Sequence, residues 1–146
     1  MCKVIFYSFR TNKSLKEFQE NKIPVFVFGS LKKDFEKFSK ILEKDKPEVV
    51  LGFAAVKSKS RSESVTVNRF GRDRKINRDG QDYYNLESLT DGQFESAKVP
   101  TTSFCNWTIY KTKEFIKNKS LNTRVSFIHF NPKDTLELLD LCKNLS

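Results

Sequence analysis

The sequence is poor in the residues from which metal sites and disulfide frameworks are built. Its 146 residues include one histidine, His129, and three widely spaced cysteines, Cys2, Cys105 and Cys142. No CxxC pair or other zinc-ligand spacing occurs, so we expect no metal site and no cofactor. An odd, scattered set of cysteines is also untypical of a disulfide-stabilised secreted domain, and we expect reduced thiols in the cytoplasm.

Long apolar stretches are also absent. No segment approaches the roughly 20 apolar residues that span a bilayer, and the first six residues have too short an apolar run for a signal peptide. We therefore expect a protein without membrane contact. Hydrophobic residues still make up 38% of the chain, 14 of them phenylalanine, which is enough for one core. A chain of this length is best described as a single domain over residues 1–146.

Acidic residues are outnumbered, since 27 lysines and arginines face 18 aspartates and glutamates, for a net charge of +9. Such a charge favours encounter with polyanions without fixing fold or chemistry. Most of the excess is lysine on the polar faces of expected helices. A solvated surface is therefore favoured over a nucleic-acid site, and no known nucleic-acid-binding motif occurs. The sequence leaves the oligomeric state open.

Short, dense apolar runs alternate with helical patterns along the chain. Runs of this kind are typical of strands buried on both faces, and amphipathic spacing between capping residues marks helices. The expected strands are residues 3–7, 24–28, 49–54, 65–67 and 124–130, and the expected helices are 14–21, 31–46, 105–118 and the segment after 132. The weakly patterned segment 71–99 is expected to be a long loop. Strands that alternate with helices predict a three-layer α/β/α sandwich around a mainly parallel sheet.

Three side chains occupy positions where chemistry is common. Cys105 precedes an expected helix, whose positive end would lower the pKa of a thiol, although a buried core position is the commoner role for a cysteine. His129 ends an apolar strand, and strand ends border the ligand crevice of open α/β sheets, although a lone histidine is more often structural. Glu63 has the chemistry to orient this imidazole but is one of 18 acidic residues.

Three short stretches together resemble one enzyme family. Residues 52–68 are similar to the pattern G-L-A-P-G-R-S-x-x-x-x-E-x-x-A-V-N of pyroglutamyl peptidases (pyrrolidone-carboxylate peptidases). The ungapped match consists of Gly52, Ala54, Ser58, Glu63, Val67 and Asn68, with Lys57 in place of the arginine. Residues 104–107 resemble the family's L-C-N-Y, and residues 127–129 resemble its F-I-H. The three stretches occur in the family's order.

This resemblance implies a phosphorylase/hydrolase-like α/β fold and a Cys-His-Glu triad. Cys105 would attack the carbonyl of an N-terminal pyroglutamyl residue, His129 would move the proton to the leaving amine, and Glu63 would hold the imidazole. Arg74 would lie near the oxyanion if one residue is inserted after Asn68, and the backbone N–H of Cys105 would be a further donor. The implied partner is a peptide with a blocked N-terminus.

The sequence departs from the family in the segment expected to bind the pyroglutamyl ring. The family has G-F-G-P-F-G-G there, whereas residues 7–12 keep Phe9 alone, with Arg10 and Asn12 replacing a glycine and an aromatic residue. A charge beside an uncharged lactam costs roughly a few kcal/mol of desolvation unless it points away. The region between Arg74 and Cys105 is also reduced. The chain therefore resembles a shortened, divergent member.

These departures leave a second hypothesis open. A catalytically weak or inactive homologue would act as a binding module for an anionic partner through a basic cluster, which consists of Lys57, Lys59, Arg61, Arg69, Arg72, Arg74, Lys75 and Arg78. Phe70, Tyr83 and Tyr84 lie nearby in sequence and have faces on which bases stack, so nucleic acid is a possible but not a favoured partner. The third hypothesis is that the protein is a plain interaction or structural subunit.

Overall fold

The computed structural model describes residues 3–89 and 92–146, and Cys2 lies outside this part of the chain. The strands are β1 (Val4–Phe9), β2 (Val25–Phe28), β3 (Val49–Ala55), β4 (Arg61–Ser62), β5 (Val65–Val67), β6 (Tyr83–Asn85), β7 (Glu95–Ser96) and β8 (Arg124–Phe130). The helices are α1 (Leu15–Glu20), α2 (Leu31–Asp45), α3 (Phe104–Asn118) and α4 (Thr135–Leu145), the last preceded by a 3-10 turn, η1 (Pro132–Asp134).

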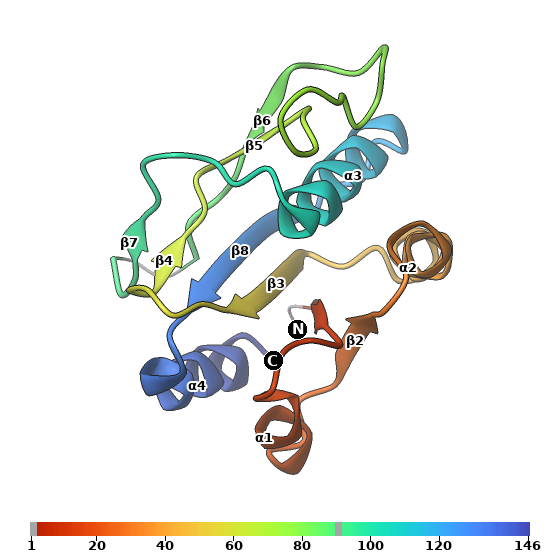
Figure 1. The fold of residues 1–146 in the computed structure, drawn as a ribbon. Coiled ribbons are helices and arrows are strands. Elements are labelled where there is room, and N and C mark those ends of the chain that lie inside the picture. Colours follow the sequence, from red (N-terminus) through yellow and green to blue (C-terminus); the bar gives the residue numbers. More distant parts are fainter. Residues whose placement is uncertain (1–2, 90–91) are drawn as a thin grey trace.

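Six strands form a central sheet in the order β2-β1-β3-β8-β4-β7 (Figure 1). The pairs β2–β1, β1–β3 and β3–β8 are parallel, and β4 runs antiparallel to β8. The expected sandwich with a mainly parallel sheet is confirmed. Two details differ from expectation: β5 pairs with β6 in a separate two-stranded sheet, and β6 and β7 lie in the segment expected to be a loop. Strands of two or three residues are too short to show a readable alternation.

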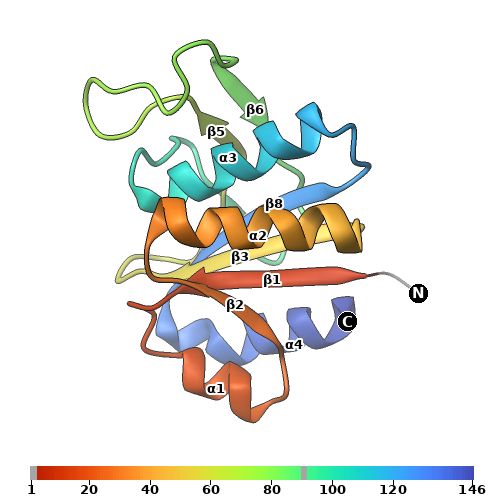
Figure 2. The same cartoon turned by 90° about the vertical axis from the view of Figure 1, so that its right-hand side faces the viewer.

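Each central strand contributes to two hydrophobic cores, because successive side chains point to opposite faces of the sheet. Helices α2 and α3 cover one face, and α1 and α4 cover the other (Figure 2). The first core contains Tyr7, Phe38, Val50, Ile109 and Phe127, and the second contains Phe18, Leu51, Phe53, Ile128 and Leu138. His129 is two residues after Phe127 and therefore lies on the side of the sheet that α3 covers.

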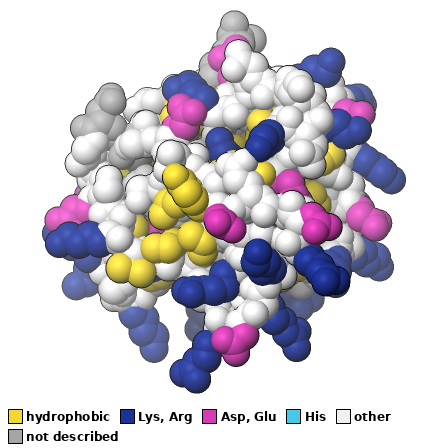
Figure 3. All heavy atoms as spheres, turned by 90° about the horizontal axis from the view of Figure 1, so that it is seen from above, with side chains coloured by type: hydrophobic (Ala, Val, Ile, Leu, Met, Phe, Trp, Pro, Cys, Tyr) yellow, Lys and Arg dark blue, Asp and Glu magenta, His cyan; other side chains and the backbone are white. Residues whose placement is uncertain are grey.

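The surface is basic but mixed. On the face shown in Figure 3, lysine and arginine side chains are spread between acidic ones and border an apolar patch. This distribution fits the solvated surface that the sequence favours. No helix within residues 3–89 and 92–146 is long and apolar enough to span a bilayer.

Gly52 of β3 leaves room for the ring of Tyr7, the largest fully buried side chain of the first core. A Cβ atom at this position would overlap the ring of Tyr7 and lie 2.6 Å from Cδ2 of Phe127. Tyr7 is fully buried, and its hydroxyl lies 3.1 Å from Oγ1 of Thr108, so the ring has no room to retreat. The match of Gly52 to the family pattern thus has a packing cause.

Replacing Gly52→Ala is expected to lower the free energy of unfolding by about 3 kcal/mol, because the added methyl overpacks the core. Chemical denaturation followed by tryptophan fluorescence measures this change. Gly29→Ala is the matched control, since a Cβ there meets nothing closer than 3.6 Å, and its cost should stay below about 1 kcal/mol. Equal losses in the two variants would contradict this account.

Candidate functional site

Cys105 is the second residue of α3, and two neighbouring side chains fix its position. Ser103 caps the helix, with an extended backbone and an Oγ that accepts the N–H of Cys105 at 3.4 Å. Asn106 is 1% exposed, and its Oδ1 accepts hydrogen bonds from Oγ1 of Thr66 at 2.6 Å and from the N–H of Val67 at 3.1 Å. Its Nδ2 donates to the carbonyl of Val67 at 2.8 Å. Asn106 therefore ties the first turn of α3 to β5.

His129 lies near the carboxyl end of β8, between Ala54 of β3 and Arg61 of β4 in the sheet register. The imidazole is buried, and its ring centroid lies 5.0 Å from that of Phe127. Nδ1 of His129 is 3.5 Å from Oε1 of Glu63. The structure thus brings together two of the three residues that the resemblance assigned to the triad.

Glu63 follows β4 directly. Its backbone N–H donates to the carbonyl of Phe127 at 2.8 Å, which fixes it beside β8. The carboxylate is buried, and within the described residues neither of its oxygens, nor Nδ1 of His129, has a hydrogen-bond partner. The imidazole of His129 is therefore close to this carboxylate but not in hydrogen-bond contact with it. Such contacts are often long in free enzymes and tighten in the substrate complex.

Arg61 is the second neighbour of this carboxylate, and sequence reasoning placed it only in the basic cluster. Its Nε lies 3.8 Å from Oε2 of Glu63, and 32% of its side chain is exposed. Arg61 pairs with His129 across β4 and β8, so the cation and the imidazole approach the same carboxylate. The i, i+2 spacing of Arg61 and Glu63 was the one signal in the sequence that their side chains could lie on the same side of a strand. Nothing in the sequence indicated that the neighbouring strand would be β8, which carries His129.

Cys105 and His129 line the same hollow, which we call the Cys105 hollow. It has a volume of about 200 Å³ and is lined by Thr11, Asn12, Ala54, Ala55, Val56, Ser103, Phe104, Cys105 and His129. These residues come from the carboxyl ends of β1, β3 and β8 and from the start of α3. Cys105 and His129 therefore border one small space at the edge of the sheet where ligands of open α/β folds bind.

Burial raises the pKa of the Cys105 thiol to about 12. The hydrogen bond to Ser103 lowers the pKa, the charge of Glu63 raises it and that of Arg61 lowers it, all by less than the effect of burial. The expectation that the helix start lowers this pKa is therefore wrong, because a thiol that is 3% exposed loses more by desolvation of its thiolate than the helix dipole restores. At neutral pH, Cys105 is therefore a protonated thiol.

Arg74 and Phe9 do not line the Cys105 hollow. Arg74 is exposed, bridges to Phe70 within its loop and borders a different hollow, so the structure gives no support to an oxyanion contact. Phe9 is buried and packs edge to face against Phe104, with ring centroids 4.8 Å apart. It lines the neighbouring hollow and supports the wall of the site from behind.

Asn12, whose expected effect was only to weaken the ring pocket, does line the Cys105 hollow. Its Nδ2 donates to Oγ of Ser8 at 3.1 Å, and its Oδ1 accepts the N–H of Ser14 at 3.0 Å. These bonds hold the turn after β1 against the site. Within the described part of the chain, no group of three or more His, Cys, Asp and Glu side chains gathers as a metal site would require.

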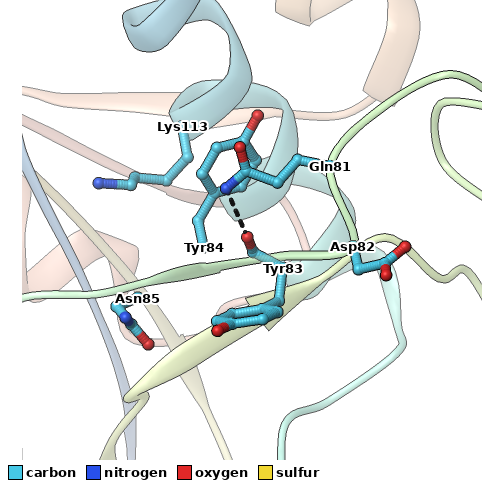
Figure 4. A pocket seen from close by; sticks show the side chains of 6 residues that line it. All are labelled: Gln81, Asp82, Tyr83, Tyr84, Asn85 and Lys113. Carbon is cyan, nitrogen blue, oxygen red and sulfur yellow. Dashed lines mark hydrogen bonds between the residues drawn. The ribbon is translucent and has the colours of Figure 1, made fainter.

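A larger hollow of about 460 Å³ lies between β6 and α3 (Figure 4). Its lining consists of Gln81, Asp82, Tyr83, Tyr84, Asn85 and Lys113, and Nε2 of Gln81 donates to the carbonyl of Tyr83 at 2.8 Å. Lys113 is about 12 Å further along α3 than Cys105, at ~1.5 Å per residue. The lining contains neither a thiol nor an imidazole, so the Cys105 hollow is the better candidate for chemistry.

The fold agrees with solved structures of pyrrolidone carboxyl peptidases. The enzyme from Thermococcus litoralis superposes with a TM-score of 0.74 at 19% identity, covering 100% of this chain and 93% of that chain. A mutant of the enzyme from Pyrococcus furiosus gives a TM-score of 0.77 at 14% identity, covering 99% and 97%. Pyroglutamyl peptidase I from Bacillus amyloliquefaciens gives 0.69 at 18% identity, covering 99% and 91%. The chain has the pyroglutamyl peptidase fold.

No protein-family model and no curated protein matches the sequence. The likeness to pyroglutamyl peptidases is therefore one of fold, at 14–19% identity in these structures. The fold confirms the architecture that the three short sequence matches implied. What the site does depends on the residues of this chain.

The raised pKa of Cys105 predicts slow alkylation of this thiol by iodoacetamide at neutral pH. Only the thiolate reacts, so Cys105 in the folded protein should react more than about tenfold more slowly at pH 7 than in the unfolded protein. The rate should still be rising at about pH 10, above the ordinary thiol pKa of 9.0 near which the unfolded protein levels off. Mass spectrometry of the Cys105 peptide measures both rates. A rate in the folded protein that levels off below about pH 8 would contradict the assignment.

Proposed function

We propose that the protein is a cysteine hydrolase that removes a pyroglutamyl or closely related residue from the N-terminus of peptides. One observation carries this proposal: Cys105 and His129 line one hollow, and a buried carboxylate faces Nδ1 of the imidazole. Nucleophile, base and orienting group are the three parts that thiol-dependent acyl transfer needs. The shared fold of pyrrolidone carboxyl peptidases supports a peptide with a blocked N-terminus as the substrate.

The first half of the reaction forms an acyl-enzyme. The thiol of Cys105 loses its proton to Nε2 of His129 as the sulfur attacks the carbonyl carbon of the N-terminal residue. A thiol with a pKa of about 12 makes this transfer part of the attack, because little thiolate exists beforehand. The imidazolium then gives its proton to the leaving amine, and the peptide bond breaks. The shortened peptide leaves with a free amino group.

The second half returns the enzyme to its starting form. His129 takes a proton from water, the resulting hydroxide adds to the thioester carbon, and the proton returns to the sulfur as the acid is released. The backbone N–H of Cys105 would donate to the developing oxyanion. Its bond to Ser103 is long, at 3.4 Å, and Oγ of that serine has a second partner in Oγ1 of Thr101 at 3.0 Å. A long bond of this kind is the one that the N–H would exchange for a bond to a substrate oxygen.

Glu63 and Arg61 act on this cycle through His129. The carboxylate of Glu63, 3.5 Å from Nδ1, would stabilise the imidazolium that forms in each half-reaction and leave Nε2 for the thiol. A buried carboxylate needs a compensating charge, and Arg61 supplies one at 3.8 Å. Glu63 and Arg61 are thus positioning residues, while Cys105 and His129 are the catalytic residues.

The geometry of Arg10 supports an uncharged N-terminal residue in the site. The sequence raised the problem of a cation beside a lactam. Arg10 is exposed and lines the neighbouring hollow near Gly29, not the Cys105 hollow. A small ring in the Cys105 hollow would contact backbone and the amide of Asn12 instead, so the desolvation cost expected from Arg10 is avoided.

The alternative of a binding module that stacks nucleobases is less well supported. Tyr84 is buried and packs against Tyr110 at a centroid distance of 5.2 Å, and Phe70 packs against the first core. Of the three aromatic residues considered for stacking, Tyr83 is the exposed one, at 53%. Two cations of the basic cluster also face acidic partners within the protein. Free thiols at Cys105 and Cys142 fit the cytoplasmic location that we propose.

Turnover of pyroglutamyl-7-amido-4-methylcoumarin tests the role of Cys105. The wild type should release the fluorophore, and Cys105→Ala should lower kcat/KM by at least about a thousandfold, because the nucleophile is gone. Cys142→Ala is the matched control, since Cys142 is a buried cysteine of α4 far from the hollow in sequence, and it should keep most of the activity. Undiminished turnover in Cys105→Ala, or no turnover by the wild type, would overturn the proposal.

A double-mutant cycle tests whether Arg61 acts through Glu63. Glu63→Gln should lower kcat by roughly 10- to 100-fold with KM nearly unchanged, because the imidazolium loses its counter-charge. Arg61→Met should cost a few-fold, about 1 kcal/mol or less for a partly exposed pair, and Arg61→Lys should restore most of it. In the Glu63→Gln background, Arg61→Met should have no further effect. Additive losses would show that Arg61 acts independently of the carboxylate.

A further inference from the structure

Two more hollows lie beside the Cys105 hollow, and each shares lining residues with its neighbour. The Cys105 hollow shares Thr11 and Phe104 with a hollow of about 210 Å³ beside β1 and the start of α2. That hollow shares Leu31 with a third, of about 260 Å³, beneath the loop that follows β5. We call the second and third hollows together the basic groove, which is lined by Phe9, Arg10, Thr11, Phe28, Gly29, Leu31, Lys32, Phe70, Arg74, Lys75, Ile76, Trp107 and Phe104.

The lining of the basic groove is largely apolar, and all of its charged residues are positive. Its four charged lining residues are Arg10, Lys32, Arg74 and Lys75, all of them exposed. Within residues 3–89 and 92–146, none of these four forms an ion pair with an acidic side chain. No acidic residue lines the groove. The positive charge of the lining is therefore not neutralised by an acidic side chain of the groove. This charge lies where a substrate chain would leave the Cys105 hollow.

Two acidic residues lie close to the groove without lining it. Oδ2 of Asp34 accepts the N–H groups of Gly29 and Ser30 at 2.7 and 2.8 Å, and these bonds hold the pKa of Asp34 below its usual value. That carboxylate is committed to the start of α2, so the helix end is not open to an anion. Asp73 is exposed and is flanked in sequence by two arginines. The local balance remains positive.

We propose that the basic groove binds the leaving part of the substrate, and that the preferred substrates are peptides with acidic side chains shortly after the blocked N-terminal residue. This inference rests on the proposed function, because it takes the Cys105 hollow as the place of the N-terminal residue. An extended peptide advances about 3.4 Å per residue and turns alternate side chains toward the same wall. Carboxylates on such a chain would meet the unpaired cations, and its apolar groups would meet the floor.

The aromatic residues of the groove favour a peptide over a nucleic acid. Trp107 is 8% exposed and packs edge to face against Phe35 with centroids 5.8 Å apart. Phe70 packs against the first core, and Phe104 meets Phe9 edge to face. Trp107 and Phe70 are thus largely covered by protein, and of these three rings Phe104, at 39%, is the exposed one. The groove therefore offers charge and apolar contact, which an acidic peptide matches.

Fluorescence anisotropy with the Cys105→Ala protein tests the groove without turnover. The probes are two dye-labelled pyroglutamyl pentapeptides, identical except that the first has Asp and Glu where the second has Asn and Gln. The acidic peptide should bind about tenfold more tightly at low salt, and the advantage should fade at roughly 0.5 M NaCl as the charges are screened. An unlabelled RNA oligonucleotide of equal charge serves as competitor. Its displacement of the acidic peptide at lower concentration than the unlabelled peptide itself would overturn the proposal.

Two triple variants of the same protein separate the groove from general surface charge. Changing Lys32, Arg74 and Lys75 to Gln should remove the preference for the acidic peptide. Changing Lys40, Lys44 and Lys143 to Gln, which are exposed lysines outside the groove, should leave it intact. Equal binding of the two peptides, or equal losses in the two triple variants, would overturn the proposal. The binding experiment uses the Cys105→Ala protein and does not depend on turnover. A wild type that fails to hydrolyse pyroglutamyl amides would therefore reject the proposed function without changing the outcome of the binding experiment.

Discussion

The site depends on a buried negative charge that has to be compensated. Glu63 is 2% exposed, and a carboxylate in that position is tolerated because His129 lies 3.5 Å from one oxygen and Arg61 lies 3.8 Å from the other. The antiparallel pairing of β4 with β8 sets Arg61 opposite His129, and the bond from the N–H of Glu63 to Phe127 holds the carboxylate beside β8. Sheet pairing thus places Nδ1 of His129 beside the carboxylate of Glu63.

The thiol is positioned by a different set of contacts. The cap by Ser103 and the four hydrogen bonds around the side chain of Asn106 set the first turn of α3 against β5. The same turn contributes Phe104, which forms part of both the Cys105 hollow and the basic groove. Cys105, His129 and the basic groove are therefore held by separate elements that meet at the carboxyl edge of the sheet.

The sequence predicts the architecture well because its signals are local. Dense apolar runs at residues 49–54 and 124–130 and the amphipathic spacing of Phe35, Phe38 and Leu42 identify the buried strands and helix. The proximity of His129 and Glu63 follows from the family pattern, not from spacing. The pKa of Cys105 could not be predicted, because burial of the thiol depends on residues far away in sequence. The same applies to Arg74, which sits in a loop whose path is set by tertiary contacts such as those of Asn68 with Asn77.

The central claim is that Cys105 is a nucleophile whose proton is taken by His129. Labelling with a pyroglutamyl chloromethyl ketone, followed by peptide mass spectrometry, tests it most directly. The account predicts modification of Cys105 in the wild type at neutral pH, at a rate that falls at least about tenfold in His129→Ala because the thiol then lacks its base. Labelling that misses Cys105, or that proceeds at the same rate without His129, would contradict the account.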